Sequence, residues 1–179
     1  SRPVGWLSIC HLGLGRIPLW QSESFDPMNQ LQEIGAELAK ELEVSLPVWV
    51  ENSTREIYQA WNGKWSREIA DQARLARERC ATEILPVLRQ LLESDISAQQ
   101  TNPMSILRRA SQYPTDVLTL YGVPPVQRDD YLEATFPEDI YGLTPTAFLD
   151  FGQACHELGI AWGATKAHLH LTKRRETDT

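Results

Sequence analysis

The sequence has few cysteines and no long apolar run. Cys10, Cys80 and Cys155 are widely spaced and form no C-x-x-C pair, unlike the dense disulfide frameworks of small secreted domains. No stretch reaches the roughly 18 uncharged apolar residues that a membrane-spanning helix needs. The apolar run at residues 3–15 lacks the cleavage site of a signal peptide and contains His11. We therefore expect a soluble, cytoplasmic protein with reduced thiols.

The motifs of common cofactor-binding enzymes and hydrolases are also absent. Gly13 and Gly15 lack the third glycine of a dinucleotide fingerprint, and there is no G-x-x-x-x-G-K-[ST], G-x-S-x-G or H-E-x-x-H. Neither an internal repeat nor the βαβ alternation of a parallel sheet is present. The sequence leaves the cofactor and the catalytic residues unknown, and it does not decide whether the protein is an enzyme.

Basic charge is in short supply. The chain has 17 Lys and Arg against 24 Asp and Glu, which gives a formal net charge of −7. Because phosphate contacts supply most of the affinity for nucleic acids, this balance argues against a nucleic-acid partner. A length of 179 residues with 42% hydrophobic residues is typical of one globular domain.

The spacing of apolar residues predicts a mainly α protein, an array or bundle of six to seven helices. An irregular apolar N-terminal arm and one short strand complete this prediction. We expect a single domain over residues 1–179, divided into an arm at 1–20, a long-helix half at 21–93, a linker at 94–101 and a short-helix half at 102–173. The halves differ because prolines punctuate the second one.

The first half contains two predicted helices before residue 66. Asp26 can cap a helix that begins at Pro27, and apolar residues then recur at three- and four-residue steps. Residues 45–52 are rich in β-branched and aromatic side chains, which favours an extended piece. Ser53 and Glu56 have the spacing of a capping box and predict a second helix start.

The strongest periodicity follows in alternating four- and three-residue steps. Its members are Ile69, Ala73, Ala76, Cys80, Ile84, Val87 and Leu91. This pattern predicts a helix with a buried seam, in which Cys80 is an inert core thiol. Pro86 predicts a kink or a restart near Glu83.

The second half is predicted to contain several shorter helices. Starts are expected at Asn102–Pro103 and at Pro114–Thr115. Further helices are predicted at 126–136, at 145–158 with an end at Gly159, and from about residue 160 to 173.

Histidines and cysteines provide one candidate site. We take His156, His168 and His170 as candidate metal ligands, together with the adjacent pairs Cys10–His11 and Cys155–His156, because thiolate and imidazole suit zinc. The alternative is that the cysteines are small core residues and the histidines ordinary surface groups.

Tryptophan and arginine provide a second candidate site. Trp6, Trp20 and Trp49 lie in segments without clear helical periodicity, and Arg67 and Arg74 are seven residues apart on one helix face. Trp and Arg are enriched in protein interfaces, so these five residues are the predicted partner-binding set. Packing of the tryptophans in the core and solvation of the arginines are the alternatives.

We accordingly expect an intracellular interaction or regulatory protein that binds a protein partner or itself, for example as a homodimer. The alternative hypothesis is a helical enzyme or a small-molecule or metal-binding protein. Its pocket would lie between the two halves and use histidine and carboxylate side chains. The junction at residues 94–101 is the predicted neighbourhood of such a site.

Overall fold

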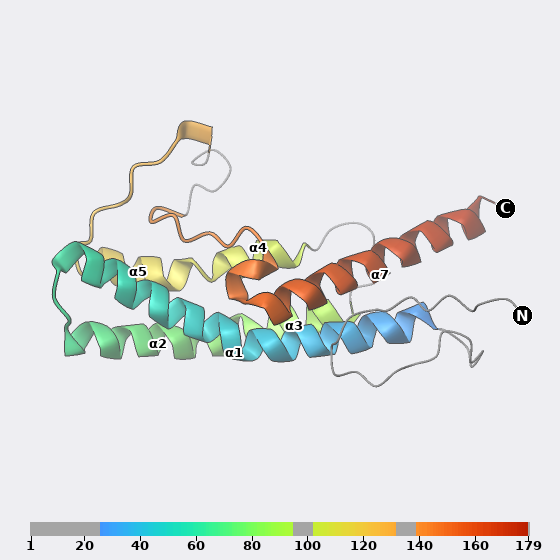
Figure 1. The fold of residues 1–179 in the computed structure, drawn as a ribbon, viewed down its shortest axis with the longest axis horizontal. Coiled ribbons are helices and arrows are strands. Elements are labelled where there is room, and N and C mark those ends of the chain that lie inside the picture. Colours follow the sequence, from blue (N-terminus) through green and yellow to red (C-terminus); the bar gives the residue numbers. More distant parts are fainter. Residues whose placement is uncertain (1–25, 95–101, 132–138, 179) are drawn as a thin grey trace, which may run out of the picture.

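The computed structural model describes residues 26–94, 102–131 and 139–178, and within these ranges it is α-helical without a strand (Figure 1). The elements are α1 (Pro27–Asn62), α2 (Arg67–Glu83), α3 (Leu85–Ser94), α4 (Pro103–Arg109), α5 (Gln112–Leu120), the 3-10 helix η1 (Phe148–Phe151) and α7 (Gln153–Thr177). The predicted mainly α class is confirmed. The predicted arm at 1–20 and residues 95–101 of the predicted linker lie outside the described ranges.

The predicted number of helices is wrong. Among the described residues, only α1, α2, α3 and α7 have ten residues or more, while α4 has seven and α5 has nine. The helices predicted to begin at Pro27 and at Ser53 are one helix, α1, and the helices predicted at 145–158 and from about 160 to 173 are replaced by one helix, α7. Of the predicted helix at 126–136, residues 126–129 are not helical, Asp130 and Tyr131 are helical, and 132–136 lie outside the described ranges.

Helix α1 runs without interruption through the segment predicted to be extended. Leu42, Leu46, Val50 and Thr54 are all buried at four-residue steps, so the helical period of the core continues across residues 45–52. Pro47 removes one backbone donor inside the helix. Burial of these side chains outweighs both the backbone hydrogen bond lost at Pro47 and the β propensity of residues 45–52, because tertiary packing can override local preferences.

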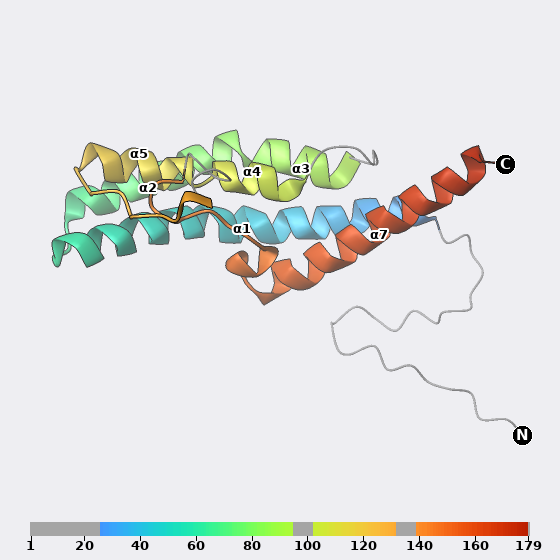
Figure 2. The ribbon, with the colours of Figure 1, turned by 90° about the horizontal axis from the view of Figure 1, so that it is seen from above.

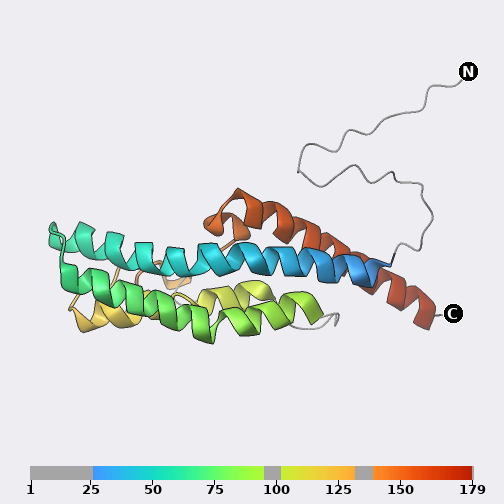
Figure 3. The ribbon, with the colours of Figure 1, turned by 90° about the horizontal axis from the view of Figure 1, so that it is seen from below.

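Helix α1 is also the central element of the fold. Figures 2 and 3 show α7 on one side of α1, and α2, α3, α4 and α5 on the other side. The Asp26 side chain caps α1 by accepting a hydrogen bond from the Met28 amide at 2.9 Å, as predicted. None of the described helices is sufficiently long and apolar to cross a membrane.

Helices α2 and α3 are separated by a single residue, Ile84. This break confirms the restart predicted from Pro86. The restart also changes which residues face inward, because Val87 is 44% exposed whereas Leu88 is buried. The predicted seam therefore holds through Ile84 and fails at Val87, where the core uses the next position.

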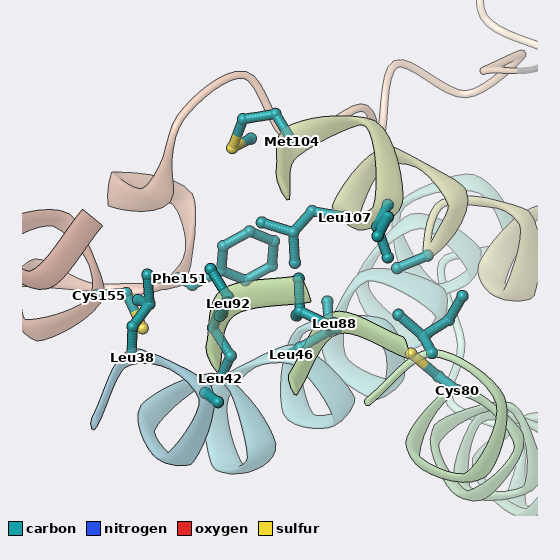
Figure 4. Packing of buried hydrophobic residues seen from close by; sticks show 14 of the residues in the cluster. Leu38, Leu42, Leu46, Cys80, Leu88, Leu92, Met104, Leu107, Phe151 and Cys155 are labelled. Carbon is teal, nitrogen blue, oxygen red and sulfur yellow. The ribbon is translucent and has the colours of Figure 1, made fainter. Parts of the chain in front are cut away.

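One large hydrophobic cluster joins all the described helices. Figure 4 shows Leu38, Leu42 and Leu46 of α1 meeting Leu88 and Leu92 of α3, with Leu107, Phe151 and Cys155 closing the cluster. Cys80 and Cys155 are buried in it as free thiols. Cys155 also approaches Ser45 of α1, with 3.5 Å between sulfur and hydroxyl oxygen.

The closest helix contact lies where α1, α3 and α7 meet. A Cβ atom added to Gly35 of α1 would stand 2.6 Å from the carbonyl carbon of Leu92 and overlap its oxygen. The Leu92 carbonyl oxygen also accepts a hydrogen bond of 2.9 Å from the buried Trp162 indole of α7.

Helix α7 begins later and continues further than predicted. Residues 145–152 contain η1 and non-helical backbone, and α7 passes through Gly159 without ending there. Gly159 is buried because the Phe148 ring lies against it, at the place where a Cβ atom would stand. This glycine therefore provides space for η1 and does not cap a helix.

A buried ion pair connects the two segments that follow α5. Arg128 and Asp139 are 2.6 Å apart, and both side chains are almost fully buried. The other carboxylate oxygen of Asp139 accepts from the Leu143 amide at 2.6 Å, and Thr144 also donates to this carboxylate. A buried carboxylate needs such partners to offset the loss of hydration.

Candidate partner-binding surface

The predicted partner-binding residues do not form one surface. Trp6 and Trp20 lie outside the described ranges. Trp49 is partly buried and packs edge-to-face against Phe151, with 5.8 Å between ring centroids. Trp49 lies 13 residues before the end of α1, about 20 Å by helical rise, whereas Arg67 is the exposed first residue of α2 beyond the turn.

Arg74 lies two turns after Arg67 on the exposed face of α2. It pairs with Asp71 at 3.8 Å and with Glu78 at 3.1 Å. All three side chains are more than half exposed, and such pairs contribute little to stability. The role of Trp49, Arg67 and Arg74 in binding stays a prediction.

The three candidate metal-binding histidines all belong to α7 but lie apart. His156 and His168 are twelve residues from each other, about 18 Å by helical rise, and His168 and His170 point to different sides because they are two residues apart. Within the described residues, no group of three or more His, Cys, Asp or Glu could hold a metal ion. Cys10 and His11 lie outside these residues, so the metal hypothesis is untested.

A group of aromatic side chains occupies the end of the bundle where α1 turns into α2. We call this surface the aromatic end, and its members are Tyr58, Trp61, Trp65, Leu120 and Tyr121. The two tryptophans are each 46% exposed, and Leu120 at the end of α5 is 76% exposed. Figure 1 shows these ends of α1, α2 and α5 together at one extremity of the molecule.

The turn between α1 and α2 positions the two tryptophans. Gly63 ends α1 with a φ of 68°, a left-handed conformation that glycine adopts without strain. Its amide donates to the Gln59 carbonyl at 2.8 Å, so the turn is fixed by a backbone hydrogen bond. Trp61 and Trp65 therefore lie on the two sides of a defined turn.

Ring contacts hold the aromatic end together. Tyr58 lies edge-to-face with Trp61 at 5.7 Å and with Tyr121 at 6.2 Å between centroids. The Arg55 guanidinium lies over the Trp65 ring, 4.2 Å from its centroid. Such contacts add to the energy of burial, so these side chains are ordered although they are partly exposed.

Hydrogen bonds and ion pairs with α1 and α2 hold Tyr121 and Arg55 in this arrangement. The hydroxyl of Tyr121, the residue that follows α5, donates to Glu68 of α2 at 2.8 Å. Partial burial and this hydrogen bond raise the pKa of Tyr121 above its ordinary value. Glu51 accepts from Arg55 at 3.4 Å and from Arg77 at 3.0 Å, and its bond to Arg55 holds that guanidinium against the Trp65 ring.

The aromatic end also carries two exposed cations. Lys64 lies in the turn and Arg67 starts α2, and both side chains are exposed. Among the described residues, neither forms an ion pair, whereas the nearby carboxylates of Glu51 and Glu68 already accept hydrogen bonds. The surface thus combines exposed aromatic rings with unpaired positive charge.

Two shallow grooves lie elsewhere on the bundle. One of about 500 Å³ is lined by residues of α1, α2 and α3, including the ion-paired Glu43 and Arg89. The other, of about 340 Å³, runs between α2 and α5 and so lies between the two predicted halves. Neither groove is lined by a histidine.

The groove between α2 and α5 contains no activated nucleophile. Tyr113 donates to Glu83 at 2.6 Å, which lowers the pKa of that carboxyl, and burial together with this bond raises the pKa of Tyr113. Cys80 lies behind these residues, and burial, with a smaller effect of Glu83, raises its pKa to about 12. A protonated, fully buried thiol is unreactive, as expected for a core cysteine.

Trp61 and Trp65 were not among the predicted partner-binding residues, because both lie in segments with helical periodicity. The pair Asn62–Gly63 between them was the available signal, since a glycine that ends a helix places its neighbours at the end of a bundle. Comparisons of the chain with models of known protein families, with curated proteins and with solved structures find no match.

Proposed function

We propose that this chain is a helical interaction protein that binds a protein partner through its aromatic end. The observation that carries this proposal is the half exposure of Trp61 and Trp65, side chains that are otherwise held by ring contacts. Large aromatic residues together with arginine are the commonest centres of binding energy in protein interfaces.

The area left exposed is sufficient to matter for binding. A Trp side chain contributes up to roughly 250 Å² when fully buried, so nearly half of that area remains on each of the two tryptophans. At about 25 cal/mol per Å², covering this area contributes about 2–3 kcal/mol for each ring. Leu120, exposed beside Tyr121, extends the same apolar surface.

Order in the unbound surface supports the same proposal. Binding costs free energy when rotamer-rich side chains must be immobilised. Here Tyr58 contacts two rings, and Arg55 is held between Glu51 and Trp65. The rings therefore lose little freedom when a partner covers them.

The alternative of an enzyme or small-molecule binder has no comparable support. The groove between the halves is shallow and has no histidine among its lining residues. The proposal consequently rests on a surface and not on a cavity.

Photocrosslinking from the aromatic end tests the proposal. A photoreactive phenylalanine analogue replaces Asn62 in the full chain, and a matched protein carries it at Lys40, an exposed position on α1. We expect one protein, another gene product or a second copy of this chain, to crosslink from position 62 and not from position 40. Mass spectrometry identifies the crosslinked partner.

Affinity measurements with the purified partner provide the decisive step. Trp61→Ala and Trp65→Ala should each weaken binding at least tenfold, while Val44→Ala, which alters a 69% exposed side chain on α1, should leave it unchanged. Circular dichroism checks that all three variants keep the helical signal. Equal affinity of wild type and both tryptophan variants would refute the proposal.

A further inference from the structure

Resting on the proposed function, we infer that the partner segment is acidic and carries an apolar or aromatic anchor. The inference comes from charge at the aromatic end. Lys64 and Arg67 are exposed on either side of Trp65, and no ion pair is described for either one. An anchor that packs on the tryptophans would place its flanking residues beside these cations.

The cations around the aromatic end outnumber its acids. Glu51 is shared by Arg55 and Arg77, and Glu68 keeps its negative charge while it accepts from Tyr121. With Lys64 and Arg67, four cations thus face two carboxylates, while Asp71, one turn after Arg67, is paired with Arg74. The exposed Glu56 is five positions before Trp61, about 140° away around α1. The side of the turn that carries both tryptophans is therefore locally positive.

The remainder of the protein strengthens this selectivity. With a net charge of −7, most of the molecule repels an acidic segment. Complementary potentials at one place on such a molecule steer a partner to that place and disfavour other contacts. The aromatic end combines attraction of carboxylates with apolar area for an anchor.

An anionic lipid surface and a single-stranded nucleic acid also carry negative charge, but the site suits them less well. Phosphate-binding surfaces usually offer many cations, and each neutralised phosphate adds to affinity. Here Lys64 and Arg67 are the exposed cations beside the tryptophans, in a protein whose net charge is strongly negative. We therefore assign a peptide segment as the occupant.

Selection from a random twelve-residue peptide library on phage tests the inference. The library is selected on the full chain and counter-selected on the Trp61→Ala/Trp65→Ala double variant, so that retained peptides depend on the aromatic end. We expect them to be enriched in Asp and Glu around Trp, Phe or Leu. Enrichment of neutral or basic peptides would overturn the inference and leave the proposed function standing, whereas no tryptophan-dependent peptide would count against both.

Fluorescence anisotropy with the selected peptides measures how much the charges of Lys64 and Arg67 contribute to affinity. Lys64→Glu/Arg67→Glu should weaken binding at least tenfold, and peptides with Asn and Gln in place of Asp and Glu should lose a similar factor. The control Lys40→Glu/Arg109→Glu makes the same change in net charge at exposed positions elsewhere and should alter affinity less than twofold. Equal effects of both charge reversals would contradict a local site. Tighter, Trp61-dependent binding to phosphatidylglycerol vesicles or to poly-uridylate would overturn the assignment of a peptide.

Discussion

Replacing Gly35 with alanine should destabilise the protein, although alanine is the better helix former. The added Cβ atom would overlap the carbonyl oxygen of Leu92, and backbone cannot move aside as a flexible side chain can. Overpacking of this kind costs roughly 1–3 kcal/mol. Displacing this carbonyl also weakens its buried hydrogen bond from Trp162, which costs roughly 1–3 kcal/mol, while helix propensity returns about 1 kcal/mol. We expect a net loss of about 3 kcal/mol.

Urea unfolding followed by circular dichroism at 222 nm measures this loss. Gly163→Ala in α7 is the matched control, because its Cβ atom would meet no atom within 4 Å. This control should be neutral or stabilising by up to about 1 kcal/mol. In a Trp162→Phe background the Gly35→Ala cost should shrink, since the indole hydrogen bond is already absent. If Gly35→Ala stabilised the protein as Gly163→Ala does, the close contact between α1 and α3 would be refuted.

Two further predictions concern buried ionisable groups. Burial raises the pKa of Cys80 from its ordinary value of 9.0 to about 12 in the folded state. As the pH rises, the unfolded state therefore loses this proton before the folded state does. The stability that Cys80 contributes is complete below pH 9 and falls by about 1.4 kcal/mol per pH unit as the pH rises toward 12. Urea melts from pH 8 to 11 should show a steeper decline for wild type than for Cys80→Ala, and parallel declines would contradict burial of the thiol. Asp139→Asn leaves Arg128 buried without its carboxylate and should cost about 3–5 kcal/mol. The exposed control Asp71→Asn should cost under about 1 kcal/mol, and a similar cost for both in urea melts would disprove the buried ion pair.

For the candidate site, the sequence predicted the types of side chain but not which of them are exposed. Tryptophan and arginine were predicted as the side chains of an interface because of their residue type, but the exposure of each one could not be read from spacing. Trp49 and Trp61 both lie in α1, yet Trp49 meets Phe151 from a segment about 100 residues later in the chain. Among the described residues, no distant segment covers Trp61 in this way, because α1 ends beside it. Which tryptophan is exposed depends on long-range contacts that a local pattern does not contain.

Local backbone chemistry is what the sequence by itself determined. Asp26 and Asn102 cap helices because a short polar side chain can accept from an amide two residues later, and Pro86 restarts a helix because it lacks a donor. These effects act within a few residues, so one sequence is enough to predict them.

Only the tertiary structure decided where helices continue and which residues they bury. Helix α1 passes through Pro47, and α7 passes through Gly159, because packing across the bundle outweighs local preferences of about 1–3 kcal/mol. Gly159, which was predicted to end a helix, instead allows close approach of Phe148, and Gly35 allows close approach of Leu92. Their neighbours come from distant parts of the chain, and for that reason the aromatic end is visible only in the folded molecule.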